Sequence, residues 1–243
     1  QAPAPNGLNG DHSQFSENAL DEIEKWFPPP VITKLNWLLK TIRGVSDGVI
    51  CDFLEVVLSS IVRGISHQDP NDLRIRRRKI SLEDADVFSL FWDKLENQYE
   101  RIEKFWSVRG YAPNKFYPAK VIEGDSRKWE NFKDMGIGGG TVDLILTSPP
   151  YATALPYIDT DRLSLLVLFG LESTRRRPVE QNLVGSREIT TGERKRLEEL
   201  LNSDSDGLSE MVTDYLIDLH RKVSTTEVGF RRKNMPALLL RFF

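Results

Sequence analysis

The sequence predicts an α/β protein in which a large all-helical region accompanies part of a parallel sheet. Three observations support this prediction. Apolar residues recur at helical spacing through most of residues 16–108. Two short aliphatic runs follow, at residues 120–122 and 142–146, and a short helical segment separates them. A strand–helix–strand order of this kind is typical of a parallel sheet with a right-handed crossover.

The composition narrows the class of protein. The chain has 243 residues, of which 40% are apolar and 28% charged, so it can bury one sizeable core or two smaller ones. No segment approaches the roughly 18–20 apolar residues of a membrane span, and no signal peptide is visible in the polar residues 1–15. With a single cysteine, Cys51, and three scattered histidines, we expect no disulfide, no metal site and a reducing cytoplasm.

Three segments are expected along the chain. Residues 1–15 are expected to form a disordered lead-in, residues 16–115 a helical region, and residues 116–243 the portion that contains the sheet. Ser16 is expected to cap the first helix, and a capping-box pattern at residues 81–84 to begin a long helix that reaches residue 108. The other expected helices cover residues 31–43, 49–65, 126–132, 160–168, 193–201, 208–223 and 236–243, with an Arg-rich loop at 172–189.

The most informative stretch is the end of the second aliphatic run. A buried strand at residues 142–146 is expected to stop at Thr147-Ser148-Pro149-Pro150-Tyr151. Two consecutive prolines make the turn rigid and remove two backbone donors, which leaves their carbonyls free to accept hydrogen bonds. Open α/β sheets bind their ligands beyond the carboxyl ends of their strands, so this loop is a candidate ligand site. The alternative is a Pro-Pro turn that only closes the strand.

The residues Ser148-Pro149-Pro150-Tyr151, placed after a strand, resemble motif IV of the DNA methyltransferases that methylate exocyclic amines. The serine form is most similar to the cytosine-N4 branch. The resemblance implies a Rossmann-like methyltransferase sheet, here a partial one, and S-adenosylmethionine as the methyl donor. It also implies that Ser148 Oγ and the Pro149 carbonyl accept hydrogen bonds from the amine of a flipped base, on which Tyr151 stacks.

The chemistry of an exocyclic amine fits these residue types. The lone pair of the amine is delocalised into the ring, so the nitrogen is a poor nucleophile. Two acceptors that bind its N–H groups localise the lone pair. Attack on a sulfonium methyl then depends on positioning and electrostatics, with no covalent intermediate on the protein.

A second block carries the resemblance to the cofactor. Residues Gly124-Asp125-Ser126-Arg127 follow the first aliphatic run and are similar to motif III of the same family. The resemblance implies that Asp125 accepts from the adenine amine of S-adenosylmethionine, with Ser126 and Thr147 beside it. The alternative for Asp125 is a helix cap. The family's Phe-x-Gly-x-Gly loop, motif I, is absent from this sequence, so we expect a missing segment or another chain to supply it.

Basic residues form local clusters although the net charge is −3. Arginine and lysine side chains on loops neutralise phosphates, so these clusters are candidate contacts to double-stranded DNA. The alternative for any single cluster is a solvated face. The candidate DNA-binding residues are Arg63, Arg74, Arg76, Arg77, Arg78, Lys79, Arg175 and Arg176.

The sequence therefore predicts a site-specific DNA methyltransferase that acts on cytosine N4 and belongs to a bacterial, cytoplasmic restriction–modification or defence system. In this interpretation residues 16–115 form a helical insertion that can grip DNA, and residues 116–243 form an incomplete catalytic portion. Two alternatives remain open. In the first, the chain is a non-catalytic DNA-binding or partner subunit of a modification system. In the second, it is a methyltransferase for adenine N6 or for RNA.

Overall fold

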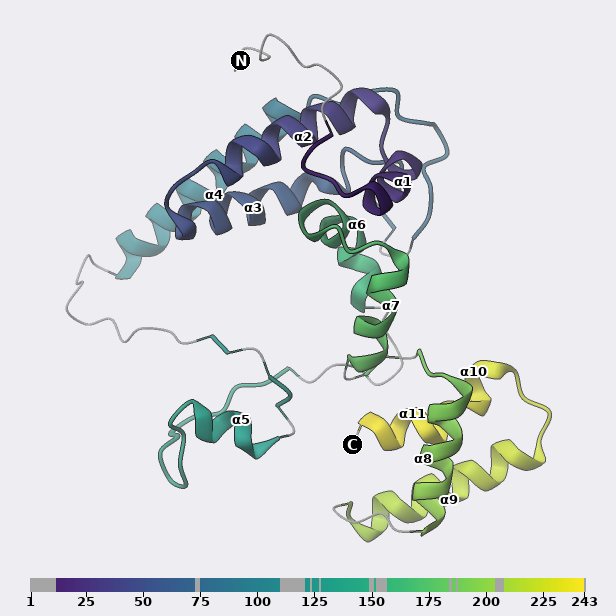
Figure 1. Cartoon of the computed structure of the whole chain (residues 1–243). Helices are drawn as coiled ribbons and strands as arrows, with labels where there is room; N and C mark the ends of the chain where they lie inside the picture. The colour runs from purple at the N-terminus through teal and green to yellow at the C-terminus, as the bar shows by residue number, and fades with distance from the viewer. Residues whose placement is uncertain are drawn as a thin grey trace. The chain divides into compact units, whose positions relative to one another are not determined.

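The computed structural model describes residues 12–72, 75–109, 121–122, 124–126, 128–148, 151, 157–183, 185–186, 188–203 and 208–242. These residues form eleven helices and no strand (Figure 1). Within them the one β-bridge is isolated and antiparallel, between Gln68 and Arg77. The chain divides into two units, residues 1–100 with 151–243, and residues 101–150.

The prediction of an α/β fold with a Rossmann-like sheet is wrong for the described residues. Residues 142–146 form no strand, and Leu144, Ile145 and Leu146 expose 79%, 79% and 94% of their surface. Val121, in the other aliphatic run, is 94% exposed. A strand is stable only when neighbouring strands satisfy its backbone groups and a second layer covers its face, and neither is present in the part that the structure describes.

Four helices supply most of the main core, and the first turns of the helix that begins at Val87 add Val87 and Phe91. The four helices are α1 (Glu17–Trp26), α2 (Pro29–Arg43), α3 (Gly48–Val62) and α6 (Tyr157–Phe169). Ser16 caps α1 as predicted, since its Oγ accepts from the Ala19 amide at 3.4 Å. Asp47 caps α3 in the same way, accepting from the Val49 and Ile50 amides.

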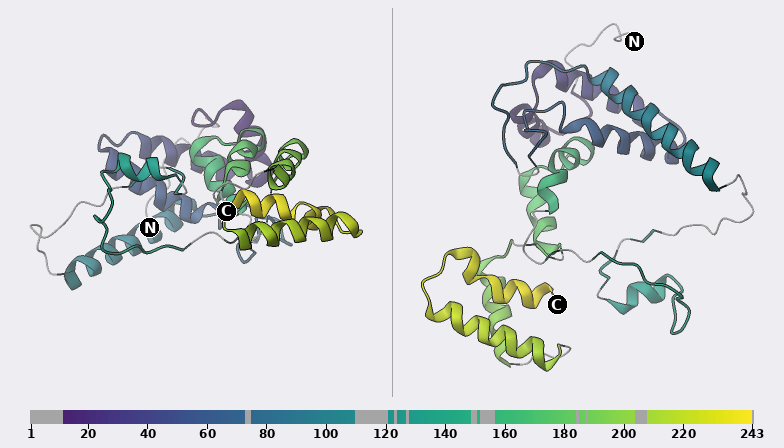
Figure 2. Two further views of the ribbon diagram at one scale, coloured as in Figure 1. Left: turned by 90° about the horizontal axis from the view of Figure 1, so that it is seen from below. Right: turned by 180° about the vertical axis from the view of Figure 1, so that it is seen from behind.

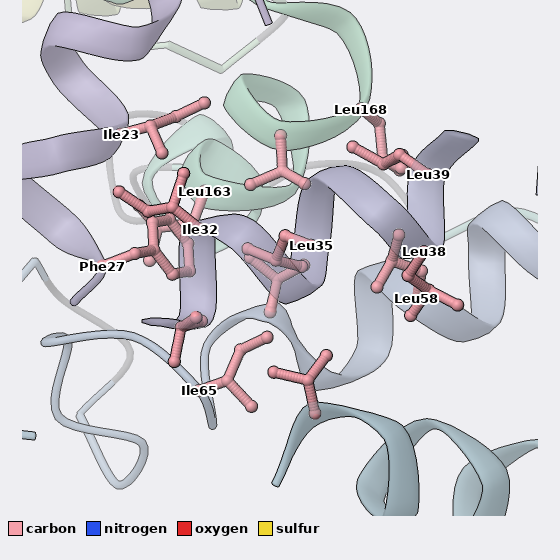
Figure 3. Packing of buried hydrophobic residues seen from close by; sticks show 14 of the residues in the cluster. Ile23, Phe27, Ile32, Leu35, Leu38, Leu39, Leu58, Ile65, Leu163 and Leu168 are labelled. Atoms are coloured by element: carbon pink, nitrogen blue, oxygen red, sulfur yellow. The ribbon is translucent and has the colours of Figure 1, made fainter. Parts of the chain in front are cut away.

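The core of this bundle is aliphatic. Figure 3 shows side chains of α1, α2, α3 and α6 meeting at its centre, together with Phe27 and Ile65 from the segments that follow α1 and α3. Leu35, Leu39, Leu58 and Leu166 are each 0% exposed. Leu166 comes from α6, so residues far along the sequence complete the core of the first hundred residues. The helix expected at residues 160–168 is present as α6, and it packs into this helical body.

Helix α4 (Val87–Arg109) begins later than the capping-box pattern predicts. Asp86 provides the local start, because its carboxylate accepts from the Ser89 amide at 3.2 Å, and these hydrogen bonds to Ser89 hold the pKa of Asp86 below its ordinary value. Only the first half of the expected apolar face is buried. Val87 and Phe91 are 0% and 8% exposed, whereas Phe105 is 52% exposed.

Helix α5 (Trp129–Asp134) lies in the second unit and ends on a glycine. Gly136 has φ of +79°, and the Gly136 and Ile137 amides donate to the carbonyls of Lys133 and Phe132. This is a Schellman motif, which requires a left-handed residue at that position. Gly136 therefore ends α5.

The remaining helices follow α6 in the chain. Helix α7 (Ser173–Asn182) occupies part of the predicted loop at 172–189, because the Glu172 carboxylate accepts from the Thr174 and Arg175 amides and caps it. Helices α8 (Thr191–Ser203), α9 (Glu210–Thr225), α10 (Phe230–Lys233) and α11 (Met235–Phe242) come next. Both views of Figure 2 keep α8, α9 and α11 together, around the buried residues Leu197, Leu201, Leu216, Ala237 and Leu240.

Candidate functional site

The candidate base-binding loop is open to solvent in the described residues. Thr147 and Ser148 are exposed, and Tyr151 is 68% exposed. Pro149 and Pro150 lie outside the described residues. Ser148 and Tyr151 fall in different units, so the structure does not place one relative to the other. The serine hydroxyl and the phenol ring are each accessible to a ligand.

The candidate cofactor residues are ordered by their own helix. Asp125 is half-buried, and its carbonyl accepts from Asn131 Nδ2 at 2.7 Å and from the Lys128 amide at 3.0 Å. A side chain at Gly124 would approach Asn131 Nδ2 to 2.9 Å, so glycine permits this contact. Neither Asp125 nor Ser126 caps α5, whose N-cap is Lys128. Arg127 lies outside the described residues.

The candidate cofactor residues lie in the unit of residues 101–150, and the two grooves of the main helical body are lined by other residues. Two grooves are formed by the main helical body, one lined from α3 and α6 and the other from α1, α6 and α7. Neither includes Asp125, Ser126 or Thr147. Within their own unit, Thr147 is exposed and Asp125 is half-buried.

The basic cluster at residues 76–79 divides into structural and exposed side chains. Arg78 Nε donates to the carbonyls of Ser66 and Gln68 at 2.8 and 3.2 Å, and its Nη2 donates to the Gly64 carbonyl. Arg78 therefore holds the turn after α3 in place. Arg76 is 70% exposed and pairs with Asp72 at 3.4 Å, and Lys79 is exposed. Arg74 lies outside the described residues.

Trp26 lies between two guanidinium groups. Arg77 and Arg162 place their Cζ atoms 4.8 and 4.7 Å from the centroid of the indole ring. Arg77 Nη2 also donates to the Lys25 carbonyl at 2.6 Å. Cation–π contacts are strongest when they are shielded from water, and Trp26 is only 8% exposed. The basic loop is thereby attached to the C-terminal end of α1.

Glu22 is the centre of a buried charge network. Its Oε1 lies 3.4 Å from Arg162 Nη2 and 3.5 Å from Arg176 Nη2, and its Oε2 accepts from the Ser173 amide at 2.7 Å. Burial, followed by repulsion from Arg176, holds the pKa of Arg162 below its ordinary value, while Glu22 opposes that shift. Glu22 thus contacts both arginines and joins α1, α6 and α7, while Glu180 pairs with Arg176 Nε at 3.4 Å.

Arg176 and Arg175 have different surroundings although they are adjacent. The Arg176 side chain is 6% exposed, and its Nη1 donates to the Leu171 carbonyl at 3.1 Å. Arg176 therefore serves the fold and cannot reach a phosphate without breaking this network. Arg175 is exposed. Arg63, at the end of α3, is half-buried and donates from Nη2 to the Thr160 carbonyl at 3.0 Å.

The sequence-based prediction did not include the ion pairs of Glu22, although the position of Glu22 on its helix indicates that it is buried. Glu22 stands at helical spacing with Ala19, Ile23 and Trp26, which form the buried face of α1. A carboxylate on an apolar face is buried only when cations accompany it. The identity of those cations has no signal in the sequence, because Arg162 and Arg176 come from two later helices.

His67 gives a pH-dependent prediction. Its pKa is lowered by burial and then by repulsion from Arg77 and Arg78, with Glu83 opposing them. The unfolded chain therefore binds a proton at His67 more readily than the folded one, so stability rises with pH across this window. The stability that neutral His67 contributes is fully present above pH 6.5, which is the ordinary pKa of histidine. This stability is lost as the pH falls through the lower pKa of His67 in the folded protein.

We expect the unfolding free energy of the wild-type protein to fall more steeply between about pH 7.5 and pH 5 than that of His67→Gln, since the variant lacks this titrating group. Urea titrations at several pH values measure this difference. Identical pH slopes for the two proteins would contradict the prediction.

The described residues were also compared with the requirements of a membrane span and of a metal site. Among the helices that the structure describes, none is both long enough and apolar enough to cross a membrane. The same residues contain no cluster of three or more His, Cys, Asp or Glu side chains suited to a metal ion.

Comparison with known proteins gives no identification. No protein-family model matches this chain, and neither a curated protein nor a solved structure is similar to it.

Proposed function

We propose that this chain contributes the base-binding segment of a DNA amino-methyltransferase. The observation that carries the proposal is the sequence Thr147-Ser148-Pro149-Pro150-Tyr151, whose serine and tyrosine are both accessible to a base. Ser148 Oγ and the Pro149 carbonyl accept hydrogen bonds from the exocyclic amine, and Tyr151 stacks on the ring. The serine form favours cytosine N4, and the setting is a restriction–modification system of the bacterial cytoplasm.

S-adenosylmethionine is the methyl donor in this proposal, with Asp125 as the acceptor for its adenine amine. Because Asp125 is only half-buried, we propose that residues outside the described ones, or another chain, complete the cofactor site. The part of this chain is to bind and orient the amine.

The role of Ser148 is tested by substitution. In a preparation that methylates DNA, Ser148→Ala removes one of two acceptors at the amine, and loss of one such group lowers turnover by about 100- to 1,000-fold. Tyr151→Ala is expected to weaken base binding by about 1–3 kcal/mol, the usual contribution of one stacked base. Mass spectrometry of nucleosides from treated DNA measures both effects.

The matched control is Ser107→Ala, which removes another exposed serine hydroxyl, one that donates only to Lys104 of its own helix. Unchanged methylation by Ser148→Ala would end the proposal for this loop. The modified nucleoside also decides the target, since N4-methylcytosine, N6-methyladenine and methylated RNA give different masses or different substrates.

The exposed basic residues give a prediction about DNA. Arg76→Ala and Lys79→Ala each remove one exposed cation, so each is expected to reduce the slope of log K against log salt concentration by about one. Lys195→Ala, an exposed lysine on α8, provides the matched control and leaves the slope unchanged. Fluorescence anisotropy with a labelled duplex at several salt concentrations measures it. Equal slopes for all four proteins would exclude this loop from the DNA contact.

A second candidate function is supported by the exposed aliphatic run. Residues 144–146 present three large apolar side chains to solvent, and such a surface is typical of a contact with another protein. The chain would then be a non-catalytic partner subunit of a modification system. Calorimetry of the complete protein with S-adenosylmethionine separates the two, because a non-catalytic partner subunit gives no binding heat whereas a complete methyltransferase does.

A further inference from the structure

A groove of about 910 Å³ runs between α3 and α6 in the main helical body. The α3 residues that line it are spaced as one face of a helix: Asp52, Glu55, Val56, Ser59, Ser60 and Arg63. The two helices approach closely at its middle, where Ser164 Oγ donates to the Ser59 carbonyl at 3.2 Å. The proposed methylation leaves this groove without a role.

One end of the groove offers hydrogen-bond donors. Gln68 lines it, is 2% exposed, and its buried Nε2 has no hydrogen-bond partner among the described residues. Buried donors are rarely left unpaired, because the lost hydration is not replaced. Arg63 lies at the same end and, in the described part of the chain, uses its Nη2 to bind the Thr160 carbonyl, so other N–H groups of the guanidinium remain for a ligand.

The other end of the groove is acidic and apolar. Asp52 is exposed, Glu55 is partly balanced by Arg43 at 3.3 Å, and the apolar side chains of Val56 and Phe169 are 65% and 63% exposed. Asp52 and Arg63 are eleven positions apart on α3, which at 1.5 Å per residue separates the two ends by about 16 Å. An extended peptide of about five residues covers that length.

The middle of the groove offers acceptors. The hydroxyls of Ser59 and Ser60 donate to the carbonyls of Val56 and Val57 at 2.7 and 2.6 Å. Because each hydroxyl hydrogen is engaged in this way, the oxygens of these two groove-lining residues are left as acceptors. Acceptors of this kind match the N–H groups of a peptide backbone, and the half-buried side chain of Leu165, which also lines the groove, matches an aliphatic residue.

We propose that this groove binds the C-terminal end of a partner polypeptide. The terminal carboxylate binds Arg63 and Gln68, an aliphatic side chain contacts Leu165, and a lysine or arginine four residues upstream pairs with Asp52. Capture of a C-terminal carboxylate by fixed donors is an established mode of peptide recognition. Asp161, which lines the donor end and is exposed, opposes the carboxylate and limits the affinity.

The probe is the pentapeptide acetyl-Lys-Ser-Leu-Ala-Leu with a free C-terminus, titrated into the full chain by calorimetry. The same peptide with a C-terminal amide removes the carboxylate, and charged hydrogen bonds of this kind correspond to roughly a 10- to 100-fold weaker affinity. A third peptide with norleucine in place of lysine removes the contact with Asp52 and binds a few-fold more weakly.

Substitutions in the chain separate binding from folding. Gln68→Leu keeps the volume and removes the unpaired donor, so peptide affinity falls at least tenfold while the melting temperature is unchanged or higher. Asp161→Asn removes the repulsion and tightens binding of the acid peptide only. Asp52→Asn weakens the lysine peptide and leaves the norleucine peptide unaffected. Glu24→Gln, at an exposed carboxylate on α1, is the matched control.

Each remaining outcome overturns the proposal. Equal affinities for the acid and amide peptides exclude carboxylate capture. A lower melting temperature for Gln68→Leu with unchanged binding makes Gln68 a residue of the fold only. No binding at millimolar peptide means that water alone satisfies the Gln68 amide.

Discussion

Replacing Glu22 with glutamine is expected to destabilise the protein by about 3–5 kcal/mol, the usual loss when one partner of a buried ion pair is removed. The side chains of Glu22, Arg162 and Arg176 are only 12%, 14% and 6% exposed, so solvent screens their charges poorly. The amide cannot balance two guanidinium groups. Both arginines then remain buried with less compensation, and the Ser173 amide at the start of α7 keeps only a neutral acceptor.

Urea denaturation followed by circular dichroism at helical wavelengths measures the loss. Glu24→Gln changes an exposed carboxylate of the same helix and is expected to stay within about 0.5 kcal/mol of the wild type. The double variant Glu22→Gln/Arg176→Met removes one stranded charge and is expected to recover part of the stability. A Glu22→Gln protein as stable as Glu24→Gln would mean that the network is solvated in solution.

The second large effect is expected at Leu166. Leu166→Ala leaves a cavity in the core shared by α1, α2, α3 and α6, where this side chain is 0% exposed, and such truncations cost about 2–5 kcal/mol. The same truncation at Leu146, which is 94% exposed, is expected to change stability by less than about 0.5 kcal/mol.

Comparing Leu146→Ala with Leu166→Ala tests whether residues 142–146 form a buried strand or are exposed. An inner strand at residues 142–146 would make Leu146→Ala as damaging as Leu166→Ala, because both side chains would be packed. Denaturation midpoints of the two variants, measured side by side, decide between the arrangements. A large loss at Leu146 together with a small loss at Leu166 would contradict the helical body described above.

The helices of the first half of the chain were predictable because their signals are local. Ser16, the prolines before α2 and the apolar spacing of α2 and α3 all act within a few residues of the structure they determine. The expected sheet depended instead on the presence of neighbouring strands, which no local signal provides. An aliphatic run such as residues 142–146 shows that a segment prefers burial, but it does not show that neighbouring strands exist to bury it.

The same distinction explains the candidate site. That Ser148 and Tyr151 lie on a loop followed from the two prolines between them, whereas the surroundings of Arg63, Arg78 and Arg176 depended on contacts with distant segments. All three arginines read as surface cations in the sequence. In the structure their guanidinium groups satisfy main-chain carbonyls or a buried carboxylate.

The cation–π contacts of Arg77 and Arg162 make the fluorescence of Trp26 sensitive to movements of either arginine. Arg77 comes from the exposed basic loop, and Arg162 belongs to the buried charge network, so one ring senses both regions. A phosphate that draws Arg77 away from the ring changes the electric field across the indole without touching it, and the emission wavelength of Trp26 shifts. In a variant that keeps Trp26 and replaces the other four tryptophans with phenylalanine, occupancy of the basic loop can thus be followed by intrinsic fluorescence, without a label on the protein or on the nucleic acid.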